Sequence, residues 1–297
     1  MTLAERLGYP PGSKLLIVHA DDVGMCHAVN DATIDAMGKG IVTSGSVMVP
    51  CPWFPEIAGR ARQNPDLDLG IHITLTSEWR YYRWRPVSPI DKVPGLIDEE
   101  GFMWRSVEDV VRHATPEEVE MEIRAQVERA LEFGMNPTHI DTHMGTIYAS
   151  PEFFEAYCRV AREFGLPAMI VSPQSQLARS MAGENPALAP IFERMRRAAE
   201  GMPILDELVT GFRSAELGPR REEFKSLIES LRPGVTQVIV HLGLNRPELR
   251  AIAGSWRKRY HDYLITSDPE MREFVEEQGV VLIGWREIKE RFFGRGG

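Results

Sequence analysis

The sequence predicts an α/β protein with a mostly parallel sheet. The expected arrangement is a single-domain, TIM-like (β/α) barrel of seven or eight strands, which need not be regular. Short apolar runs rich in β-branched residues alternate with longer segments of helical period along the whole chain. This alternation is typical of strands buried between helices. The alternative, an open doubly wound sheet, would carry a Gly-rich phosphate loop after its first strand, and no such loop follows residues 15–20. A chain of 297 residues accommodates one barrel domain over residues 1–297.

The individual strands and helices follow from local signals. Strands are expected at residues 15–20, 44–49, 69–75, 138–142, 168–171, 237–242 and 280–283, with a weaker candidate at 204–209. Thr115 followed by Pro116 is a typical helix start and Gly134 a typical stop, and Ser150 and Gly165 repeat this pattern. Helices are expected at residues 27–38, 115–133, 150–164, 222–231, 269–278 and 286–293.

Two long connections, residues 77–114 and 173–203, interrupt the alternation, and one short helix is expected in the second. Loops of this length usually form lids or binding loops, so both are expected at the rim of a site. The first loop is rich in aromatic residues, of which Trp79, Tyr82 and Trp84 are the candidates for substrate contact. Hydrophobic packing is the simpler alternative for these rings.

Composition excludes several classes of protein. The formal charge is −9, so the chain lacks the basic surface that is typical of nucleic-acid-binding proteins. The basic runs at 194–197 and 257–259 are interpreted as solvated helix faces. The 3 cysteines support no disulfide framework. Because neither a signal peptide nor a membrane-length apolar run is visible, a cytoplasmic protein without membrane or nucleic-acid partners is expected. A homodimer is the base-rate expectation.

The residues that could perform chemistry stand at the ends of the predicted strands. Active sites of barrels form at the carboxyl ends of the strands, and five of the 8 histidines lie in these runs. The polar residues concerned are His19, Asp21, Asp22, His72, His139, Asp141, His143 and His241. One Asp with two His is a common ligand set for a divalent metal, while a second carboxylate could serve as a general base.

Each of these residues also has a purely structural interpretation. A single strand histidine, such as His72 or His241, is more often a hydrogen-bonded core residue than a ligand. Asp21 and Asp22 would point to opposite faces of a regular strand, and one of them could cap a helix. Taken together, the cluster favours a site.

Four ordered motifs resemble those of the YdjC-like, or ChbG-type, carbohydrate deacetylase family. These motifs are LIVHADDVG at 16–24, GIVTSGSVMV at 40–49, GIHITLT at 70–76 and PTHIDTH at 137–143. The order and spacing agree over residues 14–150, and a looser match follows at 240–243. His19 stands where the family often has Asn, and Val23 where Phe is common.

This resemblance implies a barrel hydrolase that removes acetyl groups from N-acetylated sugars with one divalent metal ion. By position, the implied metal ligands are Asp22, His72 and His143. His139 remains the alternative to His143, because both lie on the same face of the predicted strand. Two imidazoles and a carboxylate suit zinc or another transition ion, and they serve magnesium less well.

The resemblance also implies roles for three further residues. Asp21 would be the general base, His241 the general acid and Asp141 a carboxylate that orients a histidine. The expected substrate is a small molecule or an oligosaccharide. Two other functions remain open: a metal-dependent hydrolase of another amide or a phosphoester, and a non-catalytic carbohydrate-binding protein.

Overall fold

A seven-stranded parallel sheet forms the centre of the molecule. The computed structural model describes residues 2–182 and 189–294. The strands are β1 (Lys14–Val23), β2 (Ser44–Val47), β3 (Leu69–Ile73), β4 (Ile140–Thr142), β5 (Glu207–Val209), β6 (Gly234–His241) and β7 (Val281–Leu282). Their order is β4-β3-β2-β1-β6-β5, and β7 pairs with β1. The predicted α/β class with a parallel sheet is therefore confirmed, including the weak candidate that became β5.

The sheet is a partial barrel rather than a closed ring of regular strands. Between β4 and β5 runs the segment 167–172, which was expected to contain a strand. It makes only isolated bridges, with the Ile140 N–H donating to Pro167 O at 2.9 Å and the Leu205 N–H donating to Ile170 O at 2.8 Å. Pro167 and Pro173 flank this segment, and neither has an N–H to donate. The expected barrel of seven or eight strands is thus incomplete on this side of the described structure.

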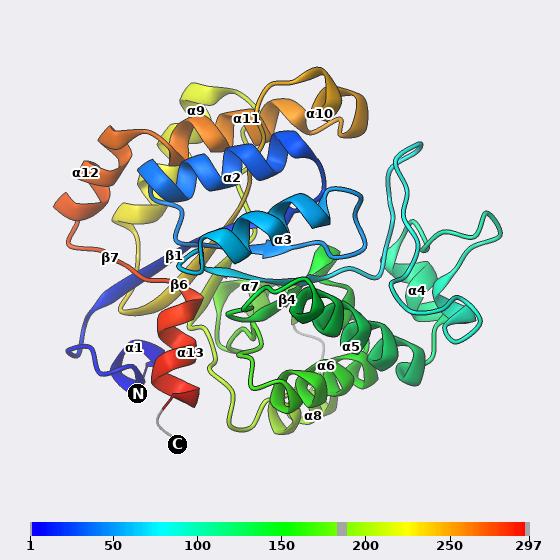
Figure 1. The fold of residues 1–297 in the computed structure, drawn as a ribbon. Helices are drawn as coiled ribbons and strands as arrows, with labels where there is room; N and C mark the ends of the chain where they lie inside the picture. The colour runs from blue at the N-terminus through cyan, green and yellow to red at the C-terminus, as the bar shows by residue number, and fades with distance from the viewer. Residues whose placement is uncertain (1, 183–188, 295–297) are drawn as a thin grey trace.

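Helices cover the sheet on its outer sides (Figure 1). One layer contains α2 (His27–Lys39), α3 (Phe54–Gln63) and α11 (Trp256–Thr266), and another contains α5 (Pro116–Glu132), α6 (Pro151–Glu163) and α8 (Ala189–Ala198). The remaining helices are α1 (Leu3–Arg6), α4 (Val107–His113), α7 (Gln176–Ala182), α9 (Leu217–Glu229), α10 (Pro247–Ile252), α12 (Pro269–Glu277) and α13 (Trp285–Phe293). Two 3₁₀ turns, η1 (Pro94–Leu96) and η2 (His143–Ala149), complete the list.

The predicted helix starts are present. Thr115 accepts the Glu118 N–H and forms a capping box, with Pro116 in the first turn. Ser150 accepts the N–H groups of Glu152 and Phe153. All six expected helices exist, with ends shifted by up to five residues, whereas α1, α3, α4, α10 and α11 were not predicted.

The two long connections are partly ordered. Residues 77–114 contain η1 and α4 and extend to one side of the barrel (Figure 1). Residues 173–203 contain α7 and α8, where one short helix was expected, and residues 183–188 of this loop lie outside the described structure. Among the described helices, none is long and apolar enough to cross a membrane.

Gly70 on β3 allows the interior of the barrel to hold a histidine. A Cβ at Gly70 would lie 2.5 Å from the His139 ring and 2.6 Å from the His139 carbonyl oxygen. We therefore expect Gly70→Ala to lower the free energy of unfolding by about 1–3 kcal/mol through overpacking, as measured by urea denaturation. Gly59→Ala in α3, where nothing lies within 4 Å of the added Cβ, is the matched control. Equal stability of the two variants would contradict this packing argument.

Candidate metal centre and active site

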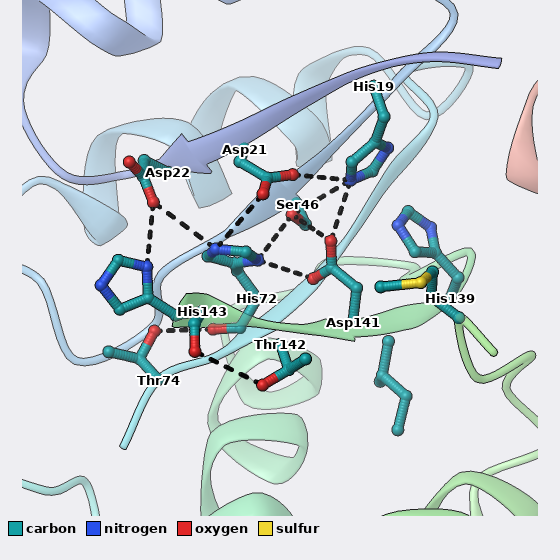
Figure 2. A network of polar contacts seen from close by, with 12 residues as sticks. His19, Asp21, Asp22, Ser46, His72, Thr74, His139, Asp141, Thr142 and His143 are labelled. Carbon is teal, nitrogen blue, oxygen red and sulfur yellow. Dashed lines mark hydrogen bonds and ion pairs between the residues drawn. The ribbon is translucent and has the colours of Figure 1, made fainter. Parts of the chain in front are cut away.

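The carboxyl ends of the strands bring most of the predicted site residues into one buried cluster (Figure 2). The cluster contains His19, Asp21 and Asp22 of β1, His72 of β3, Asp141 of β4 and His143 at the start of η2. All of these side chains are less than a tenth exposed. His241, at the end of β6, lies at the edge of this cluster. His139 adjoins its inner side, where its ring centroid lies 5.0 Å from that of His19.

The end of β1 turns so that two adjacent carboxylates face one site. Asp22 has a φ of 62°, and the pairing of β1 with β2 shifts register between Ala20 and Val23. A left-handed conformation at a residue other than glycine costs about 1–3 kcal/mol and is concentrated at functional sites. This irregularity explains why Asp21 and Asp22 do not point to opposite faces as they would in a regular strand.

Asp22, His72 and His143 form the three-residue group expected for a metal. One donor atom from each lies within 4.8 Å of the other two. Asp22 Oδ1 lies 3.1 Å from His143 Nδ1 and 3.5 Å from His72 Nε2, yet this buried oxygen receives no well-aligned hydrogen bond. Buried acceptors are rarely left without a partner. A divalent cation between these atoms would satisfy all three, so the residues fit such a group.

Asp141 holds His72 from the side away from Asp22. His72 Nδ1 lies 2.7 Å from Asp141 Oδ1, and the other carboxylate oxygen accepts a hydrogen bond from Ser46 at 2.8 Å and lies 3.0 Å from His19 Nε2. Burial alone would raise the pKa of Asp141, but the nearby His72 and His19 outweigh it and hold this pKa well below its usual range. Asp141 is therefore an ionised partner that orients His72.

His139 lies deeper in the barrel, where it forms a second group of possible ligands with His19 and Asp141 instead of joining Asp22 and His72. Its ring stacks on Trp285 with centroids 4.9 Å apart, and its Nδ1 lies 2.9 Å from Thr138 Oγ1. Burial lowers its pKa well below the usual value. His143, and not His139, is the histidine that joins Asp22 and His72.

Asp21 lies beside the group of three without joining it. Its carboxylate is 3.5 Å from His19 Nε2 and 3.9 Å from His72 Nε2. Burial raises the pKa of Asp21 to about 7, despite the opposing influence of His72. A carboxyl group with this pKa can accept and return a proton near neutral pH.

His241 is less buried than the predicted metal ligands and Asp21. Its side chain is 39% exposed, and its Nε2 lies 3.9 Å from Asp22 Oδ2. Partial burial and the nearby Arg259 cation lower the pKa of His241 to about 4, against the opposing effect of Asp22. A ring with this pKa is neutral near pH 7.

Two functional neighbours were missed by sequence reasoning. Arg259 was assigned to a solvated basic run, but it is only 5% exposed, and its Nη2 lies 2.5 Å from Asp22 Oδ2. Burial alone would raise the pKa of Asp22, and the Arg259 guanidinium together with the two histidines holds it well below its usual range. Glu78 reaches His143 Nε2 at 3.1 Å. Neither residue belongs to a predicted strand end, so only the assembled fold reveals them.

The aromatic residues of the 77–114 loop pack mainly on one another. The Trp79 ring lies 5.4 Å from Trp84 and 6.4 Å from Tyr82 between centroids. Trp84 is only 3% exposed and supports the other two rings from behind. Tyr82 donates a hydrogen bond to the Met25 carbonyl at 2.5 Å, which ties the loop to the segment after β1. Trp79 and Tyr82 are the partly exposed members and remain the candidates for substrate contact.

Fold and site together define an α/β partial-barrel protein with a buried Asp–His–His centre at the carboxyl ends of its strands. The YdjC-like protein family matches residues 15–277, so this chain belongs to the YdjC-like family. The carbohydrate deacetylase of Thermus thermophilus is 34% identical over 293 residues, covering 99% of this chain and 100% of the relative. The chitooligosaccharide deacetylase of Yersinia enterocolitica is 32% identical over 168 residues, covering 55% of this chain and 62% of the relative.

A solved structure shows the same fold. It is a protein of Enterococcus faecalis, provisionally described as a cellobiose-phosphate cleavage protein, with a TM-score of 0.75 and 25% sequence identity. The match covers 93% of this chain and 99% of that chain. The family membership implied by the four sequence motifs is thereby confirmed over most of the chain.

Proposed function

We propose that this protein is a metal-dependent carbohydrate deacetylase that removes an acetyl group from an N-acetylated sugar or glycoconjugate. The observation that carries the proposal is the convergence of Asp22, His72 and His143 around a buried oxygen without a hydrogen bond, with the carboxyl group of Asp21 beside them. The names of the full-length relative from Thermus thermophilus and of other family members support the same reaction.

The three donor residues would hold the metal. Asp22 offers Oδ1, His72 offers Nε2 and His143 offers Nδ1, a set that suits zinc or another transition ion. Bound there, a divalent cation would polarise the amide carbonyl and acidify a water molecule. Burial alone would lower the pKa of His72, but the carboxylates of Asp141 and Asp21 outweigh it and raise this pKa well above its usual value. The carboxylates around His72 thus favour a positive charge in the centre of this group.

Asp21 would move the proton in this reaction. Its pKa of about 7 allows it to take a proton from the attacking water and, after the tetrahedral stage, to give one to the departing amine. His241 at the edge of the site is the second candidate donor. With a pKa near 4, it acts as an acid only after gaining a proton in the substrate complex.

Release of acetate tests the proposal directly. The purified protein, first treated with a chelator and then given zinc, is incubated with a panel of N-acetylated sugars and oligosaccharides, and acetate is measured. We expect acetate only when metal is present, and none from Asp22→Asn, which lacks a full ligand set. Hydrolysis of phosphoesters without acetate release would instead establish a hydrolase of another bond. Sugar binding without any turnover would establish a non-catalytic protein.

A further inference from the structure

We infer that Glu78 is a positioning residue, which fixes the metal-facing nitrogen of His143 and so connects the 77–114 loop to the metal centre. The inference rests on the proposed function and extends it to a residue outside the family motifs. Its basis is a contact on the far side of the His143 ring from Asp22.

The two nitrogens of His143 face two different carboxylates. Nδ1 lies 3.1 Å from Asp22 Oδ1, while Nε2 lies 3.2 Å and 3.1 Å from the two oxygens of Glu78. A neutral imidazole carries one N–H and one lone pair. When Nε2–H donates to Glu78, the lone pair remains on Nδ1 and is directed toward Asp22 and His72. A carboxylate behind a ligating histidine commonly fixes the tautomer and ring orientation in this way.

Glu78 acts through the histidine rather than as a further ligand. Asp22, His72 and His143 form a candidate metal group in the described part of the chain, and Glu78 is not a member of that group. The Glu78 side chain is 23% exposed, compared with 6% for His143, which places it on the outer side of the ring. His72 shows the same arrangement, since Asp141 contacts its Nδ1 while Nε2 faces the cluster.

The loop is built to hold Glu78 in place. The preceding residue, Ser77, donates its N–H to the Trp104 carbonyl at 2.7 Å, and its hydroxyl accepts the Trp84 N–H at 3.1 Å. Arg83 donates to the Ser77 carbonyl at 3.2 Å and pairs with Asp98 at 2.7 Å. Glu78 therefore follows a buried residue that is held by three hydrogen bonds, and movement of this loop would move the carboxylate away from His143.

Zinc binding by Glu78→Gln tests the inference. The variant keeps the shape of the side chain and removes its charge. We expect its zinc Kd, measured by calorimetric titration of the metal-free full-length chain, to rise about 10–100-fold. The Tm of the metal-free variant should stay unchanged, and kcat/KM should recover at saturating zinc. Glu99→Gln, an exposed position on the same loop, is the matched control and should bind zinc as the unaltered protein does.

The possible results separate the inference from the function. If Glu78→Gln binds zinc as tightly as the control, while the unaltered protein binds zinc and releases acetate, only the positioning role is overturned. A metal-free Tm that falls as affinity falls would show a structural role instead and would also overturn it. If the unaltered protein binds no divalent ion, the metal-dependent function fails, and the inference fails with it.

Discussion

Replacing Asp21 with Asn is expected to lower the turnover rate about 10²–10⁴-fold while leaving the metal in place. Asn keeps the size and shape of the side chain but cannot take a proton from water. Because Asp21 lies outside the group of Asp22, His72 and His143, zinc affinity should change little. Steady-state acetate release and metal content of the purified variant provide the two measurements.

Asp22→Asn is the matched comparison for this experiment. This variant has the same Asp-to-Asn change at the neighbouring residue, but we expect it to lose the bound metal and, as a consequence, its turnover. Full activity in Asp21→Asn would remove Asp21 as the base. Loss of zinc from Asp21→Asn would instead make it a ligand.

Replacing Arg259 with Met is expected to destabilise the metal-free protein by about 3–5 kcal/mol, because removing one partner of a buried ion pair leaves the other charge uncompensated. Both side chains of the Arg259–Asp22 pair are nearly fully buried, at 6% and 2% exposure. Zinc should recover part of the loss, since a bound cation replaces the guanidinium as a partner of Asp22 and stabilises the folded state. Urea denaturation with and without zinc measures both effects.

The pH dependence of this loss has a definite sign. Arg259 holds the folded-state pKa of Asp22 below its usual value of 3.8, so the pair contributes stability above about pH 4 and loses it as the pH falls through the lowered pKa. The difference between Arg259→Met and the unaltered protein should therefore be full at pH 7 and smaller in acid. Lys258→Met, the exposed neighbour on α11, serves as the control. Equal stability of the two variants would show that the buried pair contributes nothing.

Sequence reasoning predicted the elements with strong local signals and missed those decided by tertiary contacts. The capping box at Thr115 and the apolar run of β1 are local, and both are present. The segment 168–171 has the composition of a strand, but the prolines at 167 and 173 restrict it to isolated bridges. Helix α11 begins with a basic run, and the sequence offers no sign that one of its arginines turns inward.

The part of the candidate site that lies at the ends of strands could be predicted from the sequence. Asp22, His72 and Asp141 stand where strands end, and parallel strands place their carboxyl ends together. The sequence pattern alone could not distinguish His143 from His139 as the ligand, because the alternation along a strand places both side chains on the same face. The structure distinguishes them by their depth in the barrel. Glu78 comes from a loop whose path is determined by packing around Trp84 and Arg83.

The left-handed backbone at residue 22 limits which side chains can stand there, whatever their chemistry. Asp, Asn and Gly adopt a φ of 62° with the least strain, and branched side chains are strongly disfavoured. A loss of function caused by Val or Ile at this position would therefore combine a missing carboxylate with a distorted strand end. Asn is the informative replacement because it keeps the backbone and changes only the charge.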